Sequence, residues 1–140
     1  MRRLSMLLSA LLFAVGAAAC NNDTPTSSTS NAPTTTEVFT DVVTPFGAKT
    51  HPFTTARSGT VTGTLLSLDP NPDSKVAVGM AMGTLNGVGT CQLLLTRDVA
   101  TVGTVINGTA SSATTLCFRV YDAAGTLTEP TTYSVQVVHP

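Results

Sequence analysis

The chain has little of what enzymes and nucleic-acid-binding proteins usually depend on. Its 140 residues include no tryptophan and two histidines, and only 11% of them are charged, with a formal net charge of −1. The basic residues are scattered along the chain, so we expect no nucleic acid as a partner. No Cys-x-x-Cys pair is present, and His51 and His139 lie at no spacing typical of a zinc site. The sequence therefore predicts no cofactor.

The same scarcity argues against catalysis and against a sugar site. No serine lies in a Gly-x-Ser-x-Gly motif, and we interpret both histidines as surface residues, so a small hydrolase is a third alternative only. Most aromatic side chains fall on the core-facing positions of the expected strands, which leaves no platform for a sugar ring. The carboxylates that could form an acid–base pair are Glu37, Asp41, Asp98, Asp122 and Glu129. We therefore expect a protein that is not an enzyme.

Residues 1–19 have the pattern of a secretory signal peptide. Arg2 and Arg3 precede an apolar stretch from Leu4 to Val15, and small residues fill positions 16–19. The apolar stretch is shorter than the ~20 residues that a transmembrane helix needs. The sequence therefore predicts export of the chain.

Ala17-Ala18-Ala19-Cys20 resembles the lipobox of bacterial lipoproteins, in which small residues precede an invariant cysteine. The resemblance implies that residues 1–19 are removed and that Cys20 carries fatty acyl chains such as palmitate. Several chains make a lasting membrane anchor, because each buried CH₂ contributes about 0.8 kcal/mol. Asn21 stands where an aspartate would resemble an inner-membrane retention signal, so we expect the outer membrane in a host with two membranes. An ordinary signal peptide beside an unrelated cysteine is the alternative.

Residues 20–36 are expected to form a lipidated, disordered tether. They are rich in Thr, Ser, Asn and Pro, so no buried surface offsets the entropy of ordering them. The anchor and the tether together predict a location in the cell envelope.

Cys91 and Cys117 remain as a pair once Cys20 is assigned to lipid. An even number of cysteines in an exported protein predicts a disulfide. The two positions are 26 residues apart, and closing a loop of that length stabilises a fold by roughly 3.5 kcal/mol. A redox or metal pair is the alternative, although no ligand pattern supports it.

Residues 37–140 have the period-two alternation of an all-β domain. Polar and apolar residues alternate strictly over Thr60–Leu65 and again over Tyr133–Val137. Between Val76 and Gly83, large side chains face one way and only Ala and Gly face the other, so another element can approach closely there. Asn86-Gly87 predicts a hairpin turn, and Val102–Gly108 predicts a further strand. We expect an antiparallel β-sandwich of seven or eight strands.

Three segments of this domain together resemble the bacterial pre-peptidase C-terminal (PPC) domain, a small β-sandwich found beside secreted proteases and on envelope proteins. They are Thr50–Leu65, Val76–Thr84, and the pair Cys117–Asp122 with Tyr133–Val137. The resemblance implies an accessory module without catalytic residues. Val78-Gly79-Met80 stands where that family has an acidic strand, so its calcium site is not carried over.

Asp69, Asn71 and Asp73 copy the first three ligand positions of a calcium loop. The sixth position is Ser74 rather than glycine, and the twelfth is Met80 rather than glutamate. The segment is therefore a calcium candidate in which an ordinary turn is favoured.

These patterns together predict a lipid-anchored envelope protein that displays a non-catalytic β-sandwich as a binding or structural module. The expected partners are the membrane, through the lipid, and an envelope protein or polysaccharide. The alternative is a carbohydrate- or cell-wall-binding module, which requires an exposed Tyr or Phe patch on one sheet face.

Overall fold

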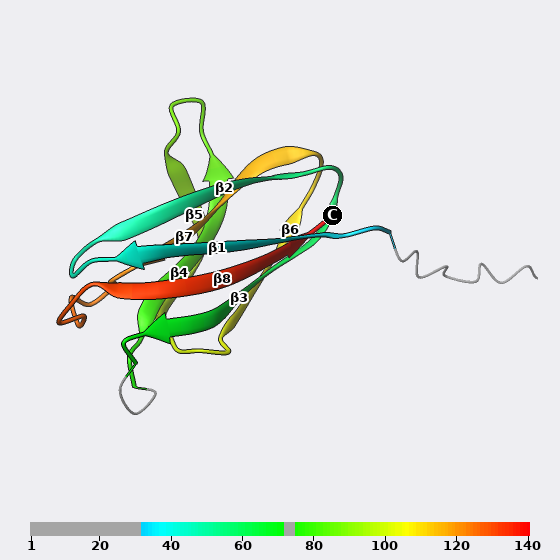
Figure 1. Cartoon of the computed structure of the whole chain (residues 1–140). Helices are drawn as coiled ribbons and strands as arrows, with labels where there is room; N and C mark the ends of the chain where they lie inside the picture. Colours follow the sequence, from blue (N-terminus) through cyan, green and yellow to red (C-terminus); the bar gives the residue numbers. More distant parts are fainter. Residues whose placement is uncertain (1–31, 72–74) are drawn as a thin grey trace, which may run out of the picture. The chain divides into compact units, whose positions relative to one another are not determined.

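The computed structural model describes residues 32–71 and 75–140, and all of its regular structure is β-strand (Figure 1). The strands are β1 (Thr35–Val43), β2 (Ala48–Thr55), β3 (Gly59–Asp69), β4 (Val78–Leu85), β5 (Cys91–Ala100), β6 (Val105–Ala110), β7 (Thr114–Tyr121) and β8 (Thr131–His139). The predicted fold class is confirmed. The signal peptide, Cys20 and the tether as far as residue 31 lie outside the described residues, as does Asp73. No helix in the described ranges has the length and hydropathy that a membrane crossing requires.

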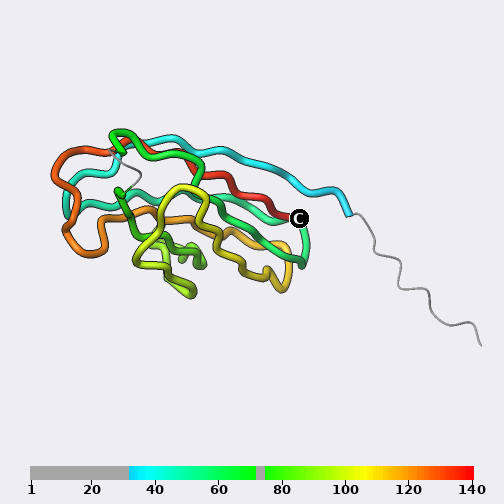
Figure 2. The backbone as a smooth tube through the Cα atoms, turned by 90° about the horizontal axis from the view of Figure 1, so that it is seen from below, coloured from blue at the N-terminus to red at the C-terminus, as the bar shows by residue number. Residues whose placement is uncertain are grey.

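The strands form two antiparallel sheets of four, in the orders β1-β8-β3-β6 and β2-β7-β4-β5. Only the β4–β5 hairpin joins neighbouring strands of one sheet, because every other connection leads to the opposite sheet. The two sheets therefore face each other as two layers (Figure 2). The first strand begins two residues before the expected boundary at Glu37, where Thr35 pairs with His139 of the last strand.

The core lies between the sheets and is made mostly of aliphatic side chains. Val135 and Val137 of β8, Leu65 of β3 and Val120 of β7 are fully buried, and each such side chain stabilises the fold by about 1.5–3 kcal/mol. The prediction that most aromatic rings face the core is confirmed for three of them, Phe53, Phe118 and Tyr133. It is wrong for Phe46, which is 83% exposed in the β1–β2 turn.

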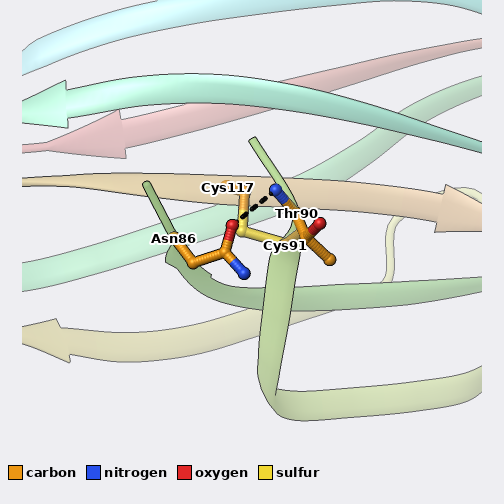
Figure 3. Close-up of a disulfide and its surroundings, with 4 residues drawn as sticks. All are labelled: Asn86, Thr90, Cys91 and Cys117. Atoms are coloured by element: carbon orange, nitrogen blue, oxygen red, sulfur yellow. Dashed lines mark hydrogen bonds between the residues drawn. A yellow bond between two sulfur atoms is a disulfide. The ribbon is translucent and has the colours of Figure 1, made fainter. Parts of the chain in front are cut away.

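Strand β4 lies between β7 and β5 and is bare on its outer face, as predicted. The ring of Tyr121 from β7 lies over Gly79, where a Cβ atom would collide with it, and the Tyr121 hydroxyl donates a 2.5 Å hydrogen bond to Asp98 of β5. Farther along, Gly83 pairs with Cys117, which forms the predicted disulfide with Cys91 of β5 (Figure 3). The Tyr121–Asp98 hydrogen bond and the Cys91–Cys117 disulfide thus both connect β7 to β5 across the glycine positions of β4.

The β4–β5 turn beside the disulfide is organised by one side chain. Asn86 Oδ1 accepts hydrogen bonds from the backbone N–H groups of Val88, at 3.2 Å, and Thr90, at 2.8 Å (Figure 3). The left-handed position of the turn is Gly89, with φ of 79°. The predicted hairpin is confirmed, and its loop reaches Cys91 through Thr90.

Candidate functional site

Three connections between strands meet at one end of the sandwich, which we call the loop end. The pairing of Val43 with Thr131 brings the β1–β2 and β7–β8 connections together, and the pairing of Asp69 with Thr132 adds the β3–β4 connection. Thr35 pairs with His139 at the other end of the same strands, beside the C-terminus (Figure 1). The chain therefore enters the domain at the end opposite the loop end.

A pocket of about 490 Å³ lies at the loop end, between the β3–β4 and β7–β8 connections and the end of β5. Its volume is within the ~300–1,000 Å³ range of small-molecule sites. Aliphatic side chains, among them Val76, Val99 and Leu127, form much of its wall. The polar residues along the wall are Lys75, Asp98, Thr126, Thr128, Glu129 and Thr131. The pocket thus offers an apolar surface with hydroxyl and charged groups around it.

Asp98 is held at the pocket by Tyr121. Burial, reinforced by the hydrogen bond to Asp98, raises the pKa of Tyr121 to about 12. The phenol is therefore protonated at neutral pH and donates its proton to Asp98 Oδ1. The Tyr121 side chain reaches from β7 across β4 to β5. The β2-β7-β4-β5 sheet therefore fixes the position of the Asp98 carboxylate at the pocket.

Asp122 fixes the connections that surround the pocket. Its buried carboxylate accepts hydrogen bonds from the backbone N–H groups of Phe46, at 3.0 Å, and Thr126, at 2.9 Å. Its own N–H donates to the Gly47 carbonyl at 3.0 Å. Because a carboxylate with several N–H donors forms strong, charge-assisted hydrogen bonds, Asp122 clamps the β1–β2 turn to the β7–β8 connection that lines the pocket.

The Phe46 side chain is exposed to solvent in the β1–β2 turn that Asp122 holds. Its φ of 58° lies in the left-handed region, which costs a residue other than glycine about 1–3 kcal/mol. The ring lies against Gly125, where an added Cβ would collide with it. An exposed aromatic ring is thus kept in a strained turn next to the pocket-lining connection.

A second polar cluster closes the side of the sandwich where β1 and β2 meet. His51 Nε2 forms a 2.6 Å hydrogen bond with the Tyr133 hydroxyl, and its ring stacks on Phe39 with centroids 4.8 Å apart. Burial lowers the pKa of His51, the positive charge of Lys49 lowers it further, and the charge of Asp41 opposes both. Burial likewise raises the pKa of Tyr133. Both groups are therefore neutral at pH 7.

The lowered pKa of His51 predicts that the fold is less stable in mild acid. The folded state binds the His51 proton less tightly than the unfolded state does, whose pKa is near the ordinary 6.5. The contribution of neutral His51 is therefore complete above that pH and decreases as the pH falls through and below 6.5. An NMR titration of the His51 ring, assigned by its absence in His51→Asn, should give a pKa below 6.5, with a parallel decrease of Tm. A His51 pKa above 6.5 would contradict the assignment of burial as the dominant cause.

The interpretation of both histidines as surface residues is wrong for His139. It is only 3% exposed, packs against the Phe53 ring at 5.2 Å, and contacts Glu37 Oε1 through Nε2 at 2.9 Å. The last strand carries it on the same inward-facing phase as Val135 and Val137. The hydrolase alternative required such a His–carboxylate contact inside a pocket, and His139 does not line the pocket at the loop end.

The remaining candidate carboxylates lie at two places in the fold. Asp41 forms an ion pair with Lys49 at 3.3 Å, whereas Asp98 and Glu129 line the same pocket. In the candidate calcium loop, Asn71 Oδ1 accepts a hydrogen bond from the Val76 N–H at 3.0 Å, as in an ordinary turn. Within residues 32–71 and 75–140, no three His, Cys, Asp or Glu side chains are arranged to hold a metal ion. The calcium candidate Asp69, Asn71 and Asp73 stays a prediction.

Sequence reasoning missed the pocket, because the residues that line it come from separate connections and form no motif. The Asp122-Ala123-Ala124-Gly125 segment held the available signal, since Asp and Gly at this spacing are typical of a turn with side-chain hydrogen bonds. Of the predicted site residues, Cys91 and Cys117 are joined, while Cys20 lies outside the described part of the chain.

No protein-family model matches this chain, and no curated protein matches it.

Proposed function

We propose that this chain is a lipid-anchored protein of the bacterial cell envelope whose β-sandwich is a non-catalytic binding module, with the pocket at the loop end as its binding site. The observation that carries the proposal is the position of the 490 Å³ pocket at the end opposite Thr35. A tether that joins the domain at Thr35 would be attached at the end of the domain farthest from this pocket.

The proposed anchor rests on the first residues of the sequence. The pattern of residues 1–19 and the Ala17-Ala18-Ala19-Cys20 segment support export and lipidation at Cys20. The segment from Cys20 to Thr34 then separates the anchor from β1. This segment, rich in Thr, Ser, Asn and Pro, is the proposed tether, and its residues up to 31 lie outside the described part of the chain.

The pocket supports a ligand with an aliphatic body and a polar or ionic group. Valine, leucine and alanine side chains suit the body, and the threonine hydroxyls and three charged groups suit the polar end. The described lining residues contribute apolar, hydroxyl and charged groups, the last including the carboxylates of Asp98 and Glu129. They include no aromatic ring, so this ligand class is favoured over a sugar that stacks on one.

Mass spectrometry of the protein extracted from its host membrane in mild detergent tests both parts of the proposal. The intact mass should lack residues 1–19 and include acyl chains. Under native conditions it should also include a small molecule that co-purifies with the domain. Ala124→Trp, which places a large side chain on the pocket lining, should abolish this adduct.

Ala113→Trp is the matched control, because Ala113 is exposed in the β6–β7 connection at the other end of the sandwich. It should retain the adduct. A mass without acyl chains contradicts the anchor, whereas no adduct in the wild type, or one that survives Ala124→Trp, contradicts the binding role of the pocket.

A further inference from the structure

The four edge strands of the two sheets differ in how well they are protected. Natural edge strands avoid pairing with other chains through charges, prolines or short length. Strand β1 carries Glu37 and Asp41, β2 contains Pro52, and β6 is six residues long. Strand β5 has ten residues, no proline, and the run Leu93-Leu94-Leu95, and its two charged residues, Arg97 and Asp98, lie outside that run. The leucine run is therefore the least protected stretch of edge.

A bulge in β5 explains why adjacent leucines are all accessible. Met82 of β4 pairs with Leu95 and Gly83 pairs with Leu93, so Leu94 has no partner on β4. The exposed fractions are 67% for Leu94, 38% for Leu93 and 39% for Leu95. Bulges redirect side chains at sheet edges. Here the bulge leaves Leu94 without a pairing partner on β4 and exposes its apolar side chain.

The apolar surface continues from β5 toward β6. Leu94 and Leu95 line a hollow of about 40 Å³ beside Gly108, whose missing side chain leaves Leu95 Cδ1 about 3.1 Å from where a Cβ would lie. Exposed apolar surface of this kind on a folded domain marks an interaction site. We call Leu93, Leu94, Leu95 and the adjoining hollow the β5 surface.

We propose that the β5 surface pairs with the β5 surface of a second copy of this chain, the two β5 strands lying antiparallel about a twofold axis at Leu94. The inference is independent of the pocket at the loop end. It assigns to the protein a symmetric dimer in which the two sheets that contain β5 form one continuous sheet.

The sequence of β5 is what favours a second copy over another occupant. With the axis at Leu94, Leu94 lies opposite its own counterpart, and Leu93 lies opposite Leu95 of the copy. In the same register Gln92 lies opposite Thr96, so no like charges oppose each other. An axis at Arg97 or at Asp98 would instead oppose two like charges. The strand is therefore complementary to itself in a register that joins its apolar residues, and a twofold contact closes as a dimer.

Sedimentation analysis of the full chain, expressed in its host and extracted in mild detergent, tests the proposal. The wild type should have the mass of two copies after subtraction of detergent, and Leu94→Asp should have the mass of one. Val88→Asp is the matched control, since Val88 is 85% exposed in the β4–β5 turn and outside the β5 surface. It should remain a dimer.

A second variant separates loss of pairing from loss of folding. Leu94→Thr keeps a residue that favours strands, so it should weaken the dimer at least tenfold while its Tm at low concentration stays that of the wild type. A single-copy mass for the wild type at micromolar concentration overturns the proposal. A two-copy mass for Leu94→Asp with unchanged concentration dependence overturns it as well.

Discussion

Replacing Cys117 with serine is expected to lower the free energy of unfolding by roughly 3.5 kcal/mol, because the disulfide to Cys91 closes a loop of 26 residues in the unfolded chain. For a domain of this size the loss corresponds to a decrease in Tm on the order of 15 °C. Cys117 is fully buried and is paired with β2 and β4 on either side. The measurement is thermal unfolding followed by circular dichroism in oxidising buffer.

Reduction of the wild type provides the control for this prediction. Dithiothreitol should lower the wild-type Tm by a similar amount and leave that of Cys117→Ser unchanged, since only the wild type has the bond to lose. An equal Tm for oxidised wild type and Cys117→Ser would show that the bridge does not stabilise the fold.

Gly83→Ala is expected to cost about 3 kcal/mol of stability, although it adds a single methyl group. A Cβ at this position would lie 2.7 Å from the carbonyl carbon of Gln92 and 3.0 Å from Leu93 Cα, and closer still to the Gln92 carbonyl oxygen. These are backbone atoms of the neighbouring strand β5, so no side-chain rotation relieves the contact. Urea unfolding of the variant and the wild type measures the difference.

Gly87→Ala is the matched control, because no atom lies within 4 Å of the position that its Cβ would occupy. Its stability should differ from that of the wild type by less than about 0.5 kcal/mol. If Gly83→Ala were as stable as Gly87→Ala, the close approach of β5 to β4 at the bulge would be wrong.

Local periodicity was enough to predict the fold class. Val78, Met80 and Met82 point into the core, and the bare opposite face of β4 admits the Tyr121 ring and the disulfide. The strand expected over Val102–Gly108 instead runs over Val105–Ala110. The reason is a turn, in which Gly103 has φ of 88° and donates its N–H to the Leu65 carbonyl. A hydrogen bond to a strand far away in the sequence set this boundary, so the local pattern could not predict it.

Local sequence patterns could not predict the pocket at the loop end for the same physical reason. Asp98 and Glu129 reach one pocket because β5 and β7 end, and β8 begins, at the same end of the sandwich, and strand order is decided by packing between distant segments. His139 was misjudged because its position near the C-terminus suggested exposure, whereas its place on the inward phase of β8 buries it. Adjacent leucines in β5 break the period-two rule, and only the register with β4 shows that a bulge accommodates them.

The pairing of β1 with β8 also determines how the domain responds to mechanical load. A ligand held at the loop end and a tether attached before Thr35 would pull the domain in opposite directions along the axis of β1. Antiparallel hydrogen bonds run perpendicular to their strands, so this force shears all nine residue pairs between Thr35 and Val43 at once. Unzipping would require the force to reach those pairs one after another. A tether attached before Thr35 would thus load the domain in the direction in which its first strand is hardest to pull away.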